Sequence, residues 1–520
     1  MSVAASRTHL PEGHASTVHW ADLISPWFSE PRRFRVLLWT APVALTAAVL
    51  LAPVPAAVLI ALAALFALLW RAPQAVVLIL IVFMGNVKFN YYAGFFTFFP
   101  EYVVLALASL VLLLRWMETR RPLEERGILL LFAAWIFAGV LSCVYAQLLG
   151  KVLARVVLIG LAALTCYLTV AGVRTERQLG RALVWWEGAA MVSVLYGIVQ
   201  MAGVILGFDT GLHFLEKHGN PFMYYGIGSP AELNFSWFFR VNAFFNDPNI
   251  LAGYLAAAMS MTLALLLRRA RVAGWRTRAR FESLLLGLGA ICMLLTLSRS
   301  GILALIAGCA TVLAFEPEVL RRGRFWFVAI AGVAGAGLAS AAMGIDPLLL
   351  VQRLAQSFNE NDVSSHVHHD VFLYGLSLLA RYPLTGVGLG NFGTHFGSEV
   401  DVYNPNMMSH NALLSYLAES GLLGGCAFLA IMGVVLWRPW RALQIQSLRR
   451  ERPELHACLV GLLGAVVAID VANLFYDYYL RTFIWVLSGL ALAAVRLAEQ
   501  PDVPDGARTG SVAAPTGAGG

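Results

Sequence analysis

Charged residues are scarce in this chain of 520 residues: they make up 13% of it, against 59% for hydrophobic residues. A soluble domain is usually about 25% charged and about 45–50% apolar. The shortage of charge excludes a soluble globular enzyme, a disordered chain and a nucleic-acid-binding protein. The hydrophobic excess indicates a membrane protein with many spans, because each helical span needs about 20 apolar residues.

Cysteine is also sparse, and its pattern excludes two kinds of site. The six cysteines lie in apolar runs without paired spacing, at Cys143, Cys166, Cys292, Cys309, Cys426 and Cys458. We therefore expect neither a disulfide framework nor a zinc site. Residues 1–30 lack the apolar stretch of a secretory signal peptide, so the first span is expected to direct membrane insertion.

The long apolar runs predict an all-α fold, a polytopic membrane helix bundle of about 12–14 transmembrane helices, with about 14 as the best reading of the hydropathy. The predicted spans are 36–52, 55–70, 73–86, 99–115, 127–148, 152–173, 182–206, 249–267, 282–298, 301–318, 325–343, 411–437, 457–475 and 481–496. The least distinct are the first two and 73–86, whose merger would lower the count.

The basic residues predict an orientation for these spans. With the N-terminus inside the cell, all but nine of the 37 Lys and Arg residues fall on the cytoplasmic side. Such sorting is the mark of a membrane topology. It places residues 1–35 and the tail 501–520 in the cytoplasm, the tail being rich in Pro, Gly and Ala and expected to be disordered.

The core of the protein is then 36–500, with two large loops on the outer side. These loops, 207–248 and 344–410, are rich in aromatic residues, Asn, Gly and Pro and are not of low complexity. We expect both to be ordered and partly helical. Ordered loops above a membrane scaffold commonly carry function.

The end of the first loop holds Arg240 and the segment Asn246-Asp247-Pro248-Asn249. Asp247 suits a helix N-cap and Pro248 suits the first helical position, so capping alone explains most of this segment. For Arg240 a surface ion pair and a functional role are equally open.

Arg299 lies between two apolar runs, in Leu297-Ser298-Arg299-Ser300-Gly301. A charge at the membrane edge is costly unless it faces a cavity or a partner. The planar guanidinium also matches phosphate oxygens. The competing interpretation is an interfacial arginine whose side chain extends to the lipid headgroups.

The second loop ends at Ser409-His410-Asn411, where a helix is predicted to begin. Ser409 is the expected cap, and Leu414, Leu417 and Gly421 share a helical face with His410. The positive end of the helix dipole disfavours a charged imidazole, and a neutral one can act as a general base. Spacing alone leaves a structural, hydrogen-bonded histidine equally possible.

Three further features are less specific. The glycines of Pro383–Phe392 lack the lysine of a phosphate loop, so a turn between two loop helices is expected. His366, His368, His369 and Asp370 suit a solvated segment better than a metal site. Within the spans, Arg155 near the outer edge is a candidate for an anion site, together with Glu419.

The motifs together resemble the O-antigen ligase and polymerase superfamily over about residues 235–425. The residues that carry this resemblance are Arg240 with Asn246–Asn249, Ser298–Gly301, Pro383–Phe392, His410-Asn411, Glu419 and Gly421. The resemblance implies an inverting glycosyltransferase that needs neither metal nor cofactor and acts on the periplasmic face of the bacterial inner membrane. The implied donor is a glycan carried on undecaprenyl diphosphate.

The same resemblance assigns roles to residues. Arg240 and Arg299 match the family's arginine positions and His410 its loop histidine; Arg155 is added as a third diphosphate ligand. Asn249, Ser298, Asn411 and Glu419 are expected to support them. A diphosphate is already a good leaving group once arginines balance its charge, so no metal is required. The acceptor hydroxyl can belong to a glycan, a lipid A core or a protein.

The chain departs from the family at the loop arginine that often precedes the Gly-Val-Gly segment, for which Arg353 and Arg381 are the candidates. Two other functions stay open. An anion transporter of the same superfamily, bicarbonate-like, would place its ionisable groups near the midplane on broken helices. A peptidoglycan-type polymerase would need an outer-loop carboxylate, for which Glu232, Asp362 and Asp370 are weak candidates.

Overall fold

The computed structural model describes most of the core of the chain. The described segments are 53–84, 91–93, 96–98, 100–119, 125–207, 224–227, 236–272, 278–321, scattered residues within 332–341, 363–399 and 409–500. The predicted span 36–52, most of the span 325–343, the two terminal segments and Arg353 lie outside the described residues.

The chain divides into two compact units. The smaller comprises Met1–Arg71 and Ser109–Pro122, and the larger Ala72–Ala108 and Leu123–Gly520. Within the smaller unit, α3 (Pro53–Arg71) meets the second half of α5 (Pro100–Thr119). There the Arg115 guanidinium lies 5.5 Å from the centroid of the Trp70 ring and donates a hydrogen bond to the Trp70 carbonyl.

Among its described residues, the larger unit is helical apart from two short hairpins. Its helices are α4 (Ala75–Met84), α6 (Arg126–Leu141), α7 (Leu149–Gly172), α8 (Glu176–Leu206), α9 (Pro248–Val272), α10 (Arg278–Leu295), α11 (Arg299–Ala314), α12 (Pro317–Leu320), α15 (Val363–Arg381), α16 (Phe392–Glu399), α17 (Ala412–Ala442), α18 (Leu448–Glu451), α19 (Pro453–Asn473) and α20 (Thr482–Glu499). A 3-10 turn, Ser142–Tyr145, follows α6.

The two hairpins are antiparallel and each has two strands. Strand β1 (Tyr91–Ala93) pairs with β2 (Phe96–Phe98), and β3 (Tyr224–Ile227) pairs with β4 (Ser236–Phe239). They are the departure from the predicted all-α fold, and they involve few residues. The second hairpin falls in the loop predicted at 207–248.

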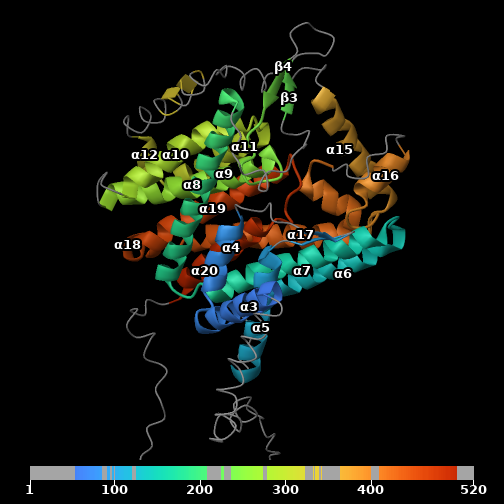
Figure 1. Ribbon diagram of the computed structural model, residues 1–520, viewed down its shortest axis with the longest axis horizontal. Helices are drawn as coiled ribbons and strands as arrows, with labels where there is room; N and C mark the ends of the chain where they lie inside the picture. Colours follow the sequence, from blue (N-terminus) through green and yellow to red (C-terminus); the bar gives the residue numbers. More distant parts are fainter. Residues whose placement is uncertain are drawn as a thin grey trace, which may run out of the picture. The chain divides into compact units, whose positions relative to one another are not determined.

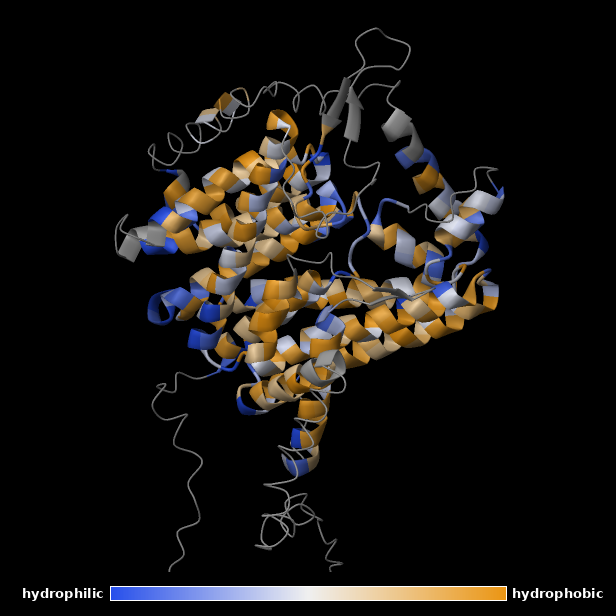
Figure 2. Cartoon of the chain, in the orientation of Figure 1, coloured by the Kyte–Doolittle hydropathy of each residue, from blue (hydrophilic) through white to orange (hydrophobic). Residues whose placement is uncertain are grey.

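The structure confirms a multi-pass membrane helix bundle. Within the described residues, eight helices are long and apolar enough to cross a membrane: α5, α6 with its 3-10 turn, α7, α8, most of α9, α17, α19 and α20. Two shorter apolar helices, Val58–Arg71 and α11, accompany them. Figure 2 shows hydrophobic residues along most of these helices and hydrophilic ones mainly at their ends. The predicted count of 14 stays a prediction.

Small residues bring the central helices close together. Helices α9, α11 and α19 pack against one another (Figure 1). A methyl group on Gly308 of α11 would lie 2.2 Å from Ser260 Oγ of α9 and 2.7 Å from the Gly464 carbonyl oxygen of α19. Glycine therefore sets the separation of these helices, as is common between transmembrane helices.

Helix α17 is broken at Gly421, whose φ is +65° and ψ −168°. The backbone groups released by this break are paired by the segment between α15 and α16. Gly388 N donates to the Glu419 carbonyl at 2.9 Å, and Leu422 N donates to the Pro383 carbonyl at 2.7 Å. The glycine-rich segment is thus the predicted turn between two loop helices, and it also stabilises the break in α17.

Ion pairs gather at the ends of the helices that carry the predicted cytoplasmic arginines. They are Arg268–Glu454 at 3.2 Å, Arg449–Glu316 at 3.3 Å, Arg438–Glu125 and Arg452–Glu176. The opposite ends of the same helices carry Asp247, Ser298 and Asn411. The arginines predicted to be cytoplasmic and the residues predicted to be on the outer side therefore lie at opposite ends of these helices.

Candidate functional site

The candidate site lies where α9, α11, α17 and α20 begin and α19 ends. The segment 474–481, which we call the α19–α20 loop, contacts the first residues of several of these helices. Since a helix begins with backbone N–H groups that have no partner within the helix, the four helix starts contribute positive potential at this end of the bundle. It is a setting that favours an anionic ligand.

Arg240, Asn249 and Ser298 form one buried hydrogen-bonded cluster. Arg240 Nη2 and Ser298 Oγ both donate to Asn249 Oδ1 at 2.9 Å. Arg240 Nε also donates to the Thr296 carbonyl at 2.9 Å. Three residues that the sequence places in two separate motifs are thus joined through a single amide oxygen.

Arg299 is the first residue of α11 and is half-buried. The preceding Ser298 caps this helix by accepting a hydrogen bond from Gly301 N at 3.2 Å. Leu297, with φ +50°, makes the tight turn from α10. The capped turn fixes the backbone position of Arg299. It places this residue directly after Ser298, which belongs to the cluster of Arg240.

Asp247 connects this cluster to the α19–α20 loop. Its Oδ1 accepts from Asn249 N at 2.7 Å, which confirms the predicted cap at the start of α9. Its Oδ2 accepts from the Tyr476 hydroxyl at 3.2 Å. Burial, followed by the charge of Asp247, raises the pKa of Tyr476, so the hydroxyl keeps the proton that it donates.

The Tyr476 ring leads on to His410. The two ring centroids are 5.9 Å apart. His410 has φ +54° and precedes α17 by two residues. Tyr476 therefore joins the arginine cluster on α9 and α11 to the histidine before α17, three parts of the chain that are distant in sequence.

The predicted cap of α17 was wrong by two residues. Asn411, and not Ser409, is the N-cap, and its Oδ1 accepts from Leu414 N at 2.9 Å. The Ser409 hydroxyl instead contacts Ser415 Oγ at 2.6 Å. The helical face predicted from His410 is also incomplete, because His410 lies outside the helix and the break at Gly421 ends the regular turn.

The surroundings of His410 keep its imidazole neutral. Burial, followed by the charge of His368, lowers the pKa of His410 to about 4. The ring of His368 on α15 lies 4.2 Å from that of His410, centroid to centroid. Among the described residues, His410 Nδ1 has no hydrogen-bond partner. Burial is thus the main cause of the neutrality that the helix dipole alone was expected to produce.

The histidine-rich segment is divided in the structure. His368 faces His410, whereas His369 Nδ1 lies 3.6 Å from Asp370 Oδ1 and both side chains are exposed. The side chain of His366 lies outside the described ones. Within the part of the chain that the structure describes, no three His, Cys, Asp or Glu side chains are grouped to hold a metal ion.

Arg155 and Glu419 belong to a second cluster, which also includes Asp477 of the α19–α20 loop. Arg155 interacts electrostatically with Glu419 and with Asp477. Glu419 also accepts hydrogen bonds from Gly390 N at 2.8 Å and Phe392 N at 3.2 Å. The charge of Arg155 is therefore compensated by acidic side chains of its own cluster.

Asn411 ties the start of α17 to the same loop. While its Oδ1 caps the helix, its Nδ2 donates to the Leu474 carbonyl at 3.1 Å. The supporting residues predicted from sequence thus divide into two groups: Asn249 and Ser298 hold Arg240, and Asn411 and Glu419 hold loop segments.

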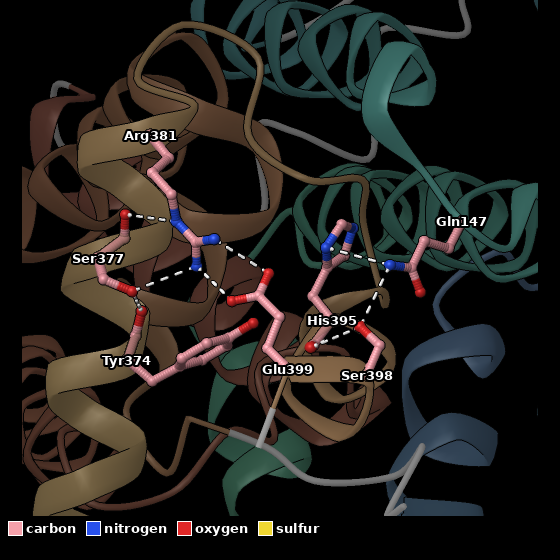
Figure 3. Close-up of polar contacts among 7 residues, drawn as sticks. All are labelled: Gln147, Tyr374, Ser377, Arg381, His395, Ser398 and Glu399. Carbon is pink, nitrogen blue, oxygen red and sulfur yellow. Dashed lines mark hydrogen bonds and ion pairs between the residues drawn. The ribbon is translucent and has the colours of Figure 1, made fainter. Parts of the chain in front are cut away.

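Arg381 is engaged elsewhere. It donates to both carboxylate oxygens of Glu399, at 3.0 and 2.8 Å, and its guanidinium lies 5.8 Å from the Tyr374 ring centroid (Figure 3). Figure 3 also shows His395 of α16 beside Gln147, their nitrogens 3.4 Å apart. Arg381 therefore joins α15 to α16, and nothing in these contacts marks it as a ligand for substrate.

Sequence reasoning missed Tyr476 and Asp477, which link the two clusters. The available signal was an acidic residue among aromatic ones, Phe475-Tyr476-Asp477-Tyr478-Tyr479, between two predicted spans on the outer side. A short loop that only connects two spans does not require so many aromatic residues, so this composition could have indicated a contact with the site. The contact of His368 with His410 was also missed, because spacing in sequence cannot bring α15 to α17.

The chain is similar in sequence to known proteins. Residues 284–429 match the O-antigen ligase family, a segment that includes Arg299, His368 and His410. The teichuronic acid biosynthesis protein TuaE of Bacillus subtilis (strain 168) is 25% identical over 459 residues, which are 84% of this chain and 87% of that protein. Together, the two comparisons support membership of the O-antigen ligase and polymerase superfamily.

Proposed function

We propose that this membrane protein transfers or polymerises an oligosaccharide from undecaprenyl diphosphate onto an acceptor hydroxyl, with inversion at the anomeric carbon and without a metal ion. The coarser assignment, a membrane glycosyltransferase of the O-antigen ligase type in polysaccharide biosynthesis, is supported by both comparisons. The observation that carries the finer proposal is the connection from Arg240 through Asn249, Asp247 and Tyr476 to His410.

The arginine end of this connection suits a diphosphate. Arg240 and Arg299 stand near the starts of α9 and α11, where backbone N–H groups add positive potential. In the reaction, the bond from the anomeric carbon to the diphosphate oxygen breaks and leaves its electrons on the diphosphate. Guanidinium groups that are already in position stabilise that developing negative charge without having to reorient. Such preorganised electrostatic stabilisation is usually a large contribution to catalysis. Arg155 would contribute at longer range from its own cluster.

The histidine end suits the acceptor. As the acceptor oxygen bonds to the anomeric carbon, its proton has to leave. A neutral His410 can take it, and its Nδ1 has no hydrogen-bond partner within the described residues. The acceptor is a hydroxyl of a glycan, a lipid A core or a protein; all three present the same group to the same base.

The proposed location follows from the basic residues. The site lies at the helix ends opposite the ion pairs of Arg268, Arg438, Arg449 and Arg452. If those arginines face the cytoplasm, as their bias predicts, the site is periplasmic and both termini are cytoplasmic, in the bacterial inner membrane. The undecaprenyl tail would then lie among the helices.

One observation favours the transporter alternative, namely the break in α17 with Glu419 beside it. Broken helices in transporters present free backbone groups to their cargo. Here those groups are paired with Pro383 and Gly388, so they are not available to an ion. We therefore retain the glycosyltransferase as the better-supported function.

A deletion experiment tests the proposal. Bacteria lacking this chain should lose one surface glycan and accumulate its lipid-linked donor, and the wild-type chain but not the His410→Ala variant should restore the glycan. If the donor pool and surface glycans were unchanged while purified chain in liposomes took up bicarbonate, the transporter would replace the glycosyltransferase.

A further inference from the structure

His368 and His410 form a pair of imidazoles at the candidate site. Their ring centroids are 4.2 Å apart and the rings are inclined at 48°. His368 is contributed by α15 and is half-buried, whereas His410 precedes α17. The pair is therefore made by tertiary structure, since 42 residues separate its members in the chain.

Among the described residues, His368 is the base nearest to His410. On its other side, His410 meets Tyr476, whose hydroxyl donates to Asp247 and is also under the influence of Arg240 and Arg481. Next to His368 on α15, the exposed His369 and Asp370 pair with each other.

The start of α17 offers no charge to His410, because its neighbours Ser409 and Asn411 are uncharged. A proton left on His410 would thus be a poorly compensated charge in a buried place, which is costly. It needs a route out after each transfer.

We propose that His368 receives from His410 the proton that His410 removes from the acceptor hydroxyl, and releases it to solvent. This inference rests on the proposed function. The acceptor oxygen bonds to the anomeric carbon, the diphosphate leaves with the electrons of the broken bond, and the proton passes from the hydroxyl to His410 and then to His368. His410 returns to its neutral form for the next transfer. His368 acts through His410 and is a positioning residue.

The experiment compares the pH dependence of kcat in the purified protein and in His368→Gln, with a lipid-linked oligosaccharide donor. When both imidazoles must be neutral, log kcat of the wild type falls with a limiting slope of two on the acid side. Log kcat of the variant should fall with a slope of one. Its kcat should be about tenfold lower, which is a fraction of the usual contribution of acid–base catalysis. Its KM for the donor should be unchanged.

Two further variants complete the test. In His368→Ala, added imidazole should restore part of the lost rate, since it can take the proton from His410. The matched control is His369→Gln, which alters a neighbouring exposed histidine and should keep both kcat and the slope of the wild type.

An unchanged kcat and slope in His368→Gln would overturn the relay. So would a uniform loss at every pH without rescue by imidazole, which would indicate a structural role. The two proposals can fail separately. An active His410→Ala would reject the glycosyltransfer mechanism itself, whereas an inactive His410→Ala with a normal His368→Gln would reject the relay alone.

Discussion

At the scale of single residues, Asn249 organises the arginine cluster. Its one amide oxygen accepts hydrogen bonds from both Arg240 and Ser298, and its backbone N–H is held by Asp247. From the sequence alone, helix capping explains Asn249, and its expected role is to support the arginines. The structure shows a specific task, which is to orient a buried guanidinium without neutralising it.

This task predicts the effect of Asn249→Asp. The new carboxylate can still accept from Arg240 and Ser298, so the variant should fold, but its charge competes with the diphosphate for Arg240. Donor affinity should fall roughly tenfold or more, the equivalent of one hydrogen bond to a charged group. Donor binding to the purified, folded variant measures this, and an unchanged Kd would contradict the assignment of Arg240 to the diphosphate.

Arg299 gives a second prediction at this scale. In Arg299→Lys the charge is kept but the planar fork is lost, and a point charge cannot hold two phosphate oxygens at once. We expect the transfer rate to fall about tenfold or more, as for the loss of a charge-assisted hydrogen bond. The control is Arg450→Lys, an exposed arginine at the opposite helix ends, which should keep the wild-type rate. A fully active Arg299→Lys would show that only its charge matters.

What the sequence predicts about these residues is their identity and chemistry. Arg240, Arg299 and His410 stood out because charge is scarce in this chain and because each lies at the edge of an apolar run. Their connection was not predictable, because it passes through Tyr476, which belongs to a loop with no motif of its own. The cap of α17 was misplaced because Ser409 and Asn411 are both good capping residues and tertiary contacts decide between them.

At the scale of elements, α17 has the sequence periodicity of one continuous helix but a backbone that is not helical at Gly421. Apolar periodicity predicted a continuous helix through Gly421, and periodicity carries no information on where the backbone breaks. The break exists because Gly421 adopts φ +65° and ψ −168°, a region essentially reserved for glycine. The freed groups are then paired by the segment from Pro383 to Phe392, which lies nearby in sequence but could not be assigned to this position from the sequence.

The same geometry predicts that Gly421→Ala is severely destabilising. A methyl group would lie 2.2 Å from both Leu384 C and Leu384 O, in addition to the unfavourable backbone conformation. We expect a loss of several kcal/mol, among the largest for single substitutions. Thermal unfolding in detergent measures it.

Gly433→Ala is the matched control, since this glycine lies in the same helix with nothing within 4 Å of the added methyl group. It should be neutral or stabilise by up to about 1 kcal/mol. Equal effects of the two substitutions would argue against the break in α17.

Helices α15 and α16 are linked by a partly exposed ion pair between Arg381 and Glu399. The bidentate contact with Arg381 lowers the pKa of Glu399, and both side chains are partly exposed. Because the folded-state pKa is the lower one, this contribution to stability is present above the ordinary pKa of Glu and is lost as pH falls through the lowered value. Glu399→Gln should cost about 1 kcal/mol or less and increase hydrogen exchange in α16. Unaltered exchange in α16 would show that apolar packing holds it instead.

At the scale of the whole molecule, composition was the strongest predictor. Scarce charge and long apolar runs were sufficient for a multi-pass helix bundle, and the predicted spans from 55–70 onward that fall on described residues each coincide with a helix. The arrangement of helices was not predictable, because contacts such as that of Gly308 with Ser260 and Gly464 depend on the shapes of three helices at once.

The orientation of the molecule predicts which residues can be labelled from each side. In a background without the six native cysteines, a cysteine in place of the exposed His369 should react with a membrane-impermeant thiol reagent applied from the periplasm. A cysteine in place of Arg450 should react only after the inner membrane is permeabilised. The reverse pattern would place the site in the cytoplasm.

The role of His410 as the general base is tested most directly by single-turnover transfer with purified His410→Gln, measured together with donor binding. The glutamine is polar and of similar size but cannot accept the acceptor proton. If His410 is the general base, donor binding should equal that of the wild type and the transfer rate should be lower by about a hundredfold or more. Transfer at the wild-type rate by the folded variant would contradict this role.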